Sequence, residues 1–89
     1  MTIWKFDLET TDQQVIQMPQ GAMILSVQTQ RGYPRMWALV NPAAEMGGRK
    51  INIHGTGHDV TEGGAFIGTY QLSGGALVFH VFDAGEIHA

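Results

Sequence analysis

Residues 66–82 constrain the fold more than any other stretch, because two apolar runs flank Ser73-Gly74-Gly75. Gly74 and Gly75 can adopt the positive φ angles that a tight β-hairpin turn requires. The second run, 76–82, places apolar residues on both faces of an extended chain. A strand of that kind is normally covered on both sides. We therefore predict a hairpin whose second arm is a central strand, or one buried between the sheet and a partner subunit.

Shorter alternating segments continue the β pattern along the chain. Residues 2–8 place Trp4, Phe6 and Leu8 on one face, and residues 22–30 are expected to turn Met23, Leu25 and Val27 inward. Further strands are predicted at 13–18, 35–40 and 49–54. The pattern indicates an all-β fold, a small antiparallel barrel or sandwich of about seven short strands with at most one helical turn. We expect a single domain over residues 1–83 and a loose C-terminal tail over 84–89.

The composition predicts that part of the surface meets another chain. Charged residues make up 15% of the sequence and hydrophobic residues 44%, whereas charged residues usually reach about 25%. A chain of 89 residues without cysteine buries a modest core and has no disulfide to support it. These features favour a homo-oligomer over a compact monomer.

The charge balance argues against broad binding of nucleic acid backbones. The net charge is −3, and a phosphate-tracking surface needs many cations. A local cationic spot can still form, since three of the five cations could converge. No apolar run is long enough for a membrane span, and the early alternation of residues is unlike a signal peptide. A cytosolic protein is therefore expected. The cations are Lys5, Arg31, Arg35, Arg49 and Lys50.

The glycine-rich segment Gly55-Thr56-Gly57-His58 is the densest polar cluster. Its backbone N–H groups could converge on an anion, with the Thr56 hydroxyl as a further donor. Arg49 or Arg35 would supply charge, and Trp37 or Tyr33 a face for stacking. The alternative is an ordinary glycine-rich β loop with exposed histidines, because known phosphate loops of this composition are followed by a helix.

No residue set indicates a metal site or catalysis. His54, His58 and Asp59 could in principle hold zinc, but a spacing of four residues brings ligands together on a helix rather than at the end of a strand. No serine lies in a Gly-x-Ser-x-Gly motif, and the carboxylates show no paired arrangement. We expect no enzyme activity, no catalytic residue, no metal and no cofactor.

Several strings resemble a family of short, uncharacterised tailed-phage and prophage proteins over nearly the whole chain, up to about Asp83. They are Gln17-Met18-Pro19-Gln20-Gly21-Ala22, Ile24-Leu25-Ser26-Val27-Gln28, Trp37-Ala38-Leu39-Val40-Asn41-Pro42, Gly55-Thr56-Gly57-His58 and Gly74-Gly75-Ala76-Leu77-Val78-Phe79-His80-Val81-Phe82. The resemblance implies a viral origin and a setting in the host cytoplasm, and it brings no reaction, ligand or catalytic residue.

For a small phage accessory protein without enzyme motifs, the resemblance implies action against host immunity. The first hypothesis is sequestration of a small phosphorylated nucleotide signal by an oligomer. The alternatives are an anti-CRISPR-like inhibitor that binds a host defence protein, and a virion or structural accessory protein. The ligand-binding residues expected under the first hypothesis are Arg35, Trp37, Arg49, Gly55, Thr56, Gly57 and His58.

Overall fold

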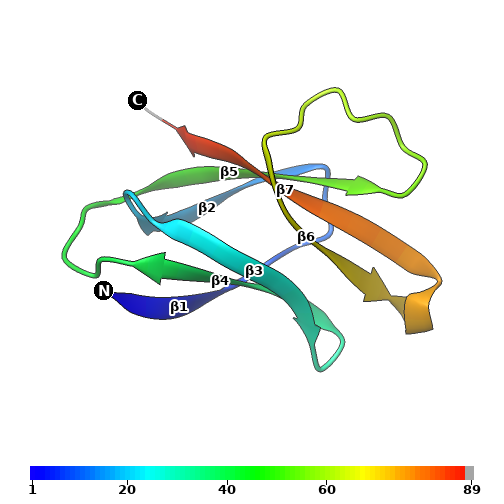
Figure 1. Ribbon diagram of the computed structural model, residues 1–89, viewed down its shortest axis with the longest axis horizontal. Coiled ribbons are helices and arrows are strands. Elements are labelled where there is room, and N and C mark those ends of the chain that lie inside the picture. Colours follow the sequence, from blue (N-terminus) through cyan, green and yellow to red (C-terminus); the bar gives the residue numbers. More distant parts are fainter. Residues whose placement is uncertain (88–89) are drawn as a thin grey trace.

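The computed structural model describes residues 1–87 and confirms the all-β prediction (Figure 1). The strands are β1 (Thr2–Asp7), β2 (Gln13–Pro19), β3 (Met23–Gln30), β4 (Tyr33–Val40), β5 (Met46–Gly55), β6 (Ala65–Leu72) and β7 (Leu77–Ile87), with one 3-10 turn, η1 (Ser73–Gly75). Among the described residues, no helix has the length and hydrophobicity needed to cross a membrane.

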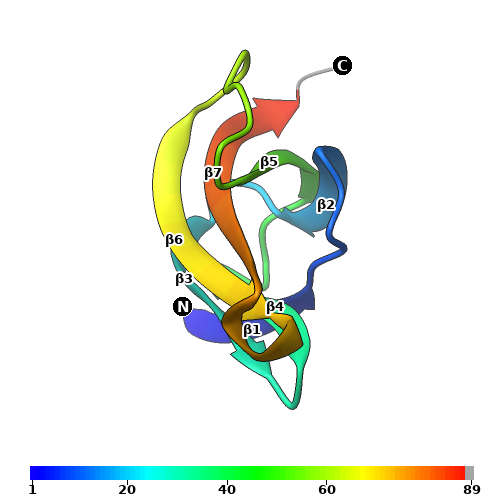
Figure 2. The same ribbon diagram turned by 90° about the vertical axis from the view of Figure 1, so that its right-hand side faces the viewer.

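The strands form two antiparallel sheets that pack face to face. Sheet A has the order β1-β4-β3, and sheet B has the order β2-β5-β7-β6. Strand β6 lies against β3, so the sheets meet along this side (Figure 2). Alternation along each strand sends one set of side chains between the sheets, as expected for a sandwich. The buried apolar core consists of Leu8, Met18, Ala22, Val27, Met36, Ala38, Val40, Ile51, Ile53, Tyr70 and Val81.

The predicted hairpin is present, and its second arm is a central strand. Strands β6 and β7 pair antiparallel from Leu72 and Leu77 outward. Ser73, Gly74 and Gly75 all have positive φ angles, of 54°, 65° and 96°, which the two glycines accept without steric cost. Strand β7 lies between β5 and β6, so the predicted central position of the second arm is confirmed.

The inward face predicted for β3 is wrong at two of three positions. Val27 is buried, but Met23 and Leu25 are 60% and 43% exposed. The cause is a bulge between Ile24 and Ser26 in the pairing of β3 with β4. An extra residue in one strand reverses the inside-outside alternation on one side of it, so Ile24 packs against the core in place of its neighbours.

The loose tail predicted at 84–89 is also wrong for residues 84–87, which continue β7; residues 88 and 89 lie outside the described residues. Gly85, Glu86 and Ile87 pair with Lys50, Arg49 and Gly48 of β5. A bulge between Lys50 and Ile51 and a positive φ of 95° at Gly85 let the strand continue with altered twist. The small polar residues of this segment therefore mark a bulged strand.

Gly68 allows β6 to approach β3 closely. A Cβ atom at this position would lie 2.9 Å from Cγ1 of the buried Val27, which is closer than packed carbon atoms tolerate. The absence of a side chain at Gly68 therefore sets how tightly the two sheets meet on this side.

We expect Gly68→Ala to lower the free energy of unfolding by about 1–3 kcal/mol, because the added methyl group overpacks the contact with Val27. Urea unfolding monitored by circular dichroism measures this change. Gly63→Ala is the matched control, since its Cβ would meet only Val60 Cγ1 at 3.9 Å. Equal effects of the two substitutions would show that the β3–β6 contact does not limit stability.

Candidate functional site

Three of the five cations line one surface hollow at the end of sheet A where β3 turns into β4. The hollow has a volume of about 350 Å³, and no carboxylate is among its lining residues. We call it the cationic hollow. Its lining residues are Lys5, Gln30, Arg31, Tyr33 and Arg35.

A tight turn and strand register bring these residues together. Arg31 and Gly32 form the two-residue turn between β3 and β4, with φ angles of 54° and 82°, as in the hairpin turns that match strand twist. Strand β1 pairs with β4 so that Lys5 lies opposite Trp37 and Asp7 opposite Arg35. The hollow therefore joins residues from both ends of a 31-residue stretch of sequence, 5–35.

Polar contacts fix two of the cations at the rim of the hollow. Lys5 Nζ donates to Gln30 Oε1 at 2.9 Å. The Arg35 guanidinium lies over the Tyr33 ring, 5.4 Å from its centre, and Arg35 Nη1 lies 3.3 Å from Asp7 Oδ1. Arg35 Nε is buried and has no hydrogen-bond partner among the described residues. Arg35 is thus held in place by Tyr33 and Asp7.

Trp37 lies on the same outer face of sheet A as the cationic hollow. Met36 and Ala38, its neighbours on β4, face the core, so Trp37 projects to the opposite side. The side chain is half-buried, and its Cα partners are Lys5 on β1 and Ser26 on β3. The structure therefore brings the predicted site residues Arg35 and Trp37 to one face, with Tyr33 nearby.

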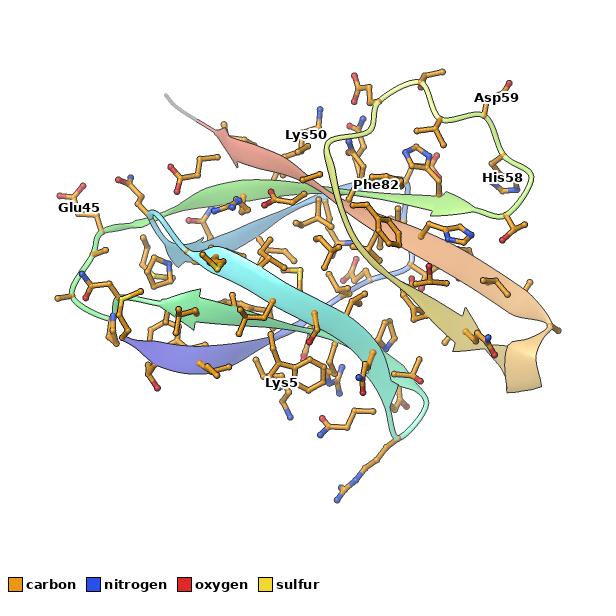
Figure 3. The ribbon with its side chains drawn as sticks, in the orientation of Figure 1. Lys5, Glu45, Lys50, His58, Asp59 and Phe82 are labelled. Carbon is orange, nitrogen blue, oxygen red and sulfur yellow. The ribbon has the colours of Figure 1, made fainter. Side chains whose placement is uncertain are left out.

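The other predicted site residues lie on sheet B, away from the hollow. Gly55 ends β5, and Thr56, Gly57 and His58 form the turn that follows it. Figure 3 shows His58 in this loop and Lys5 on the far side of the molecule. The expected single site that combines these loop residues with Arg35 and Trp37 is not formed within one chain.

The turn after β5 uses its donors within the protein. Thr56 N–H donates to Val78 O at 3.1 Å, and His58 N–H donates to Gly55 O at 3.1 Å. The Thr56 hydroxyl is 2.8 Å from His80 Nε2. A Cβ on Gly55 would lie 3.1 Å from His58 Cε1, so the His58 ring rests against this glycine. Two N–H groups expected to bind an anion are therefore already bonded.

His54 and His80 have protein partners of their own. His80 lies between the hydroxyls of Thr56 and Thr69, with the second at 3.0 Å from Nδ1. His54 Nε2 is 2.7 Å from Glu62 O. Across residues 1–87, no group of three or more His, Cys, Asp or Glu side chains is placed to hold a metal ion.

Arg49, the remaining predicted cation, is held by sheet B. Its Nε and Nη2 donate to the two carboxylate oxygens of Asp83 at 2.9 and 2.7 Å, and Nη1 donates to Ala22 O at 2.9 Å. The side chains of Arg49 and Asp83 are only 12% and 16% exposed. The hydrogen bond from Arg49 lowers the pKa of Asp83 below its ordinary value, against the opposing effect of burial. Arg49 is therefore a structural residue with little freedom to meet a ligand.

The depressed pKa of Asp83 gives a prediction about acid stability. The ionised carboxylate stabilises the fold above the unfolded-state pKa, and this contribution disappears as the pH falls through the folded-state pKa. Asp83→Asn should lower the free energy of unfolding by about 2 kcal/mol at neutral pH and should have little effect in acid.

Urea unfolding at neutral and acidic pH measures both effects. Asp59→Asn is the matched control, because Asp59 lies in an exposed part of the loop after β5. If Asp83→Asn and Asp59→Asn gave the same stability at every pH, the proposed role of the Arg49–Asp83 pair would be contradicted.

The comparisons with known proteins identify a family and no function. No curated protein and no solved structure matches the chain. The family described as Domain of unknown function (DUF7352) matches residues 1–88, which is nearly the whole sequence. The chain therefore belongs to the DUF7352 family.

Proposed function

We propose that this protein binds a small phosphorylated ligand of the nucleotide class in the cationic hollow, without catalysing a reaction. The observation that carries the proposal is the convergence of Lys5, Arg31 and Arg35 on a hollow with no carboxylate in its lining. In a chain with a net charge of −3, such a cluster creates a local positive field. It fits a small anion better than a long polyanion, which needs an extended track of cations.

The lining residues match the two parts of a nucleotide. Arginine guanidinium groups bind phosphate oxygens through paired hydrogen bonds, and Lys5 supplies a further positive charge. Tyr33 in the hollow, and Trp37 on the same sheet face, offer aromatic surfaces on which a base can stack. A volume of about 350 Å³ lies within the range of small-molecule sites. The lining side chains supply charge, hydrogen bonds and stacking, and the proposal needs no chemical step.

The biological role proposed for this binding is sequestration of a nucleotide signal. The resemblance to tailed-phage proteins supports a role against host immunity in the host cytoplasm. The hydrogen-bond donors of the hollow suit a protein that captures a signal without altering it. This role is a proposal about the setting, whereas the hollow supports only the chemistry of binding.

Thermal melting and calorimetry with cyclic di- and trinucleotides and ADP-ribose derivatives test the proposal. A ligand that binds only the folded state, at 100 times its dissociation constant, stabilises the protein by about 2.7 kcal/mol. Arg31→Gln and Arg35→Lys should each weaken binding by about tenfold or more, since each removes charge-assisted hydrogen bonds. Affinity should also fall with added salt.

Lys50→Gln is the matched control, because Lys50 pairs with Glu62 on sheet B. It removes a cation and leaves the hollow intact. Unphosphorylated adenosine controls for stacking alone. The proposal would be contradicted if no phosphorylated compound shifted the melting temperature, or if Lys50→Gln weakened binding as much as Arg31→Gln.

A second candidate function is docking on a host defence protein through the outer face of sheet A. Ile3, Leu39 and Met23 lie side by side across β1, β4 and β3, and Ile3 and Met23 are 57% and 60% exposed. Exposed apolar rows of this kind often mark protein contacts. Met23→Glu should then abolish inhibition of a purified defence complex, whereas Arg31→Gln should not; the reverse result would favour ligand binding.

A further inference from the structure

Strand β1 has a free edge that is suited to pairing with another strand. In the sheet order of residues 1–87, β1 is terminal and pairs with β4 on one side only. A free edge presents unpaired backbone N–H and C=O groups and is a template for strand addition.

The register shows which backbone groups point outward. Leu8 N–H donates to Pro34 O at 3.2 Å, and this bond continues the pairing in which Phe6 lies opposite Met36. In an antiparallel pair, only alternate residues exchange hydrogen bonds with the neighbouring strand. The backbone groups of Trp4 and Phe6 therefore point toward β4, and those of Lys5 and Asp7 point outward.

The other edges are less suited to pairing. Strands β3 and β6, which are edge strands of the two sheets, pack against each other, so each covers part of the other's edge. Strand β2 ends at Pro19, which has no N–H to donate. Its residues Gln13 and Val15, whose backbone groups point outward, carry no charge that could pair with a second copy. On β1, Lys5 and Asp7 carry opposite charges two residues apart and share the outer face of sheet A.

We propose that β1 pairs with β1 of a second copy in an antiparallel arrangement, with Phe6 on the two-fold axis. In this register Lys5 lies opposite the partner's Asp7, and Asp7 opposite the partner's Lys5. Both positions have outward backbone groups, so the alternate hydrogen bonds of an antiparallel ladder form at these pairs. Phe6 meets the partner's Phe6 at a pair without backbone bonds, where side chains lie closest.

The charge pattern makes the edge complementary to itself. A two-fold interface uses the same surface on both copies, so an alternation of opposite charges about the axis satisfies both sides at once. Asp7 already lies 3.3 Å from Arg35 Nη1. The partner's Lys5 would add a second cation beside Asp7, and the two copies of sheet A would form one continuous sheet.

Paired charge reversals test this register. Lys5→Glu places like charges opposite each other in the homodimer, and Asp7→Lys does the same with the opposite sign. Sedimentation at micromolar to sub-millimolar concentration should show a dimer for the natural chain and a monomer for each single variant. An equimolar mixture of the two variants should form a heterodimer, because each reversed residue then meets its opposite.

General electrostatic attraction between the two variants would not account for this heterodimer. Each reversal changes the charge by two, so the net charge of −3 becomes −5 for Lys5→Glu and −1 for Asp7→Lys. The two variants repel each other overall, and only a local pairing brings them together. The combined variant Lys5→Glu/Asp7→Lys exchanges the two charges, so opposite charges again face each other across the two-fold axis. It should therefore form a homodimer.

Glu45→Lys is the control for a charge reversal away from the edge. Figure 3 shows Glu45 in the loop before β5, away from Lys5, and we expect its variant to remain dimeric. Circular dichroism and melting curves establish that each variant is folded. If a single variant does not fold, the combined variant alone decides. A monomeric natural chain, or folded single variants that stay monomeric when mixed, would overturn the proposal.

Lys5 takes part in both proposals, and Arg31, which lies outside β1, separates them. Arg31→Gln leaves the edge of β1 unchanged and should leave the dimer unchanged while it weakens ligand binding. Failure of association therefore leaves the cationic hollow unaffected as a proposal, and failure of ligand binding leaves the dimer proposal unaffected.

Discussion

The contact between Arg49 and Asp83 joins the parts of this fold. Arg49 on β5 binds both carboxylate oxygens of Asp83 on β7 and also the carbonyl of Ala22. Ala22 directly precedes β3, which belongs to the other sheet. Glu86 on β7 accepts a hydrogen bond from the N–H group of Gly21, the residue before Ala22. One guanidinium thus fixes a bulged pair of strands in sheet B and the point where the chain enters sheet A.

Ion pairs on sheet B also limit where positive charge is available. Arg49 and Lys50 are neutralised on sheet B by Asp83 and Glu62. Lys5, Arg31 and Arg35 gather on the outer side of sheet A. The protein is acidic overall, and its cations are divided between a pair on sheet B and a cluster of three on sheet A, in which Arg35 is also paired with Asp7. The cluster on sheet A lies on and around β4. The inward side chains of β4, among them Met36 and Ala38, anchor this strand in the core. A rigid strand therefore supports the candidate site.

Local features of the sequence predicted the elements well, because alternation and glycine turns act over a few residues. The hairpin around Gly74 and the two-faced strand β7 follow from such features. The bulge near Leu25 could not be predicted, since it depends on how β3 pairs with β4. The continuation of β7 past Asp83 depends in the same way on β5. Residues that look like a polar tail in isolation become a strand once a neighbour supplies hydrogen bonds.

The candidate site was predicted only in part, for a related reason. Arg35 and Trp37 share one strand face, and alternation alone places them together. Lys5 joins them because β1 pairs with β4, and no local pattern reveals that pairing. Gly55 and His58 were grouped with a ligand on the basis of composition, but composition does not show that nearby carbonyls already accept the Thr56 and His58 N–H groups.

The central claim is that anions bind at the β3–β4 turn of sheet A. Two-dimensional ¹H–¹⁵N NMR during titration with pyrophosphate tests it most directly, because each backbone amide reports its own surroundings. The account predicts concentration-dependent shifts confined to the amides of Lys5, residues 30–33 and Arg35, which disappear in Arg31→Gln. Shifts centred on residues 55–58, or none at saturating pyrophosphate, would contradict it.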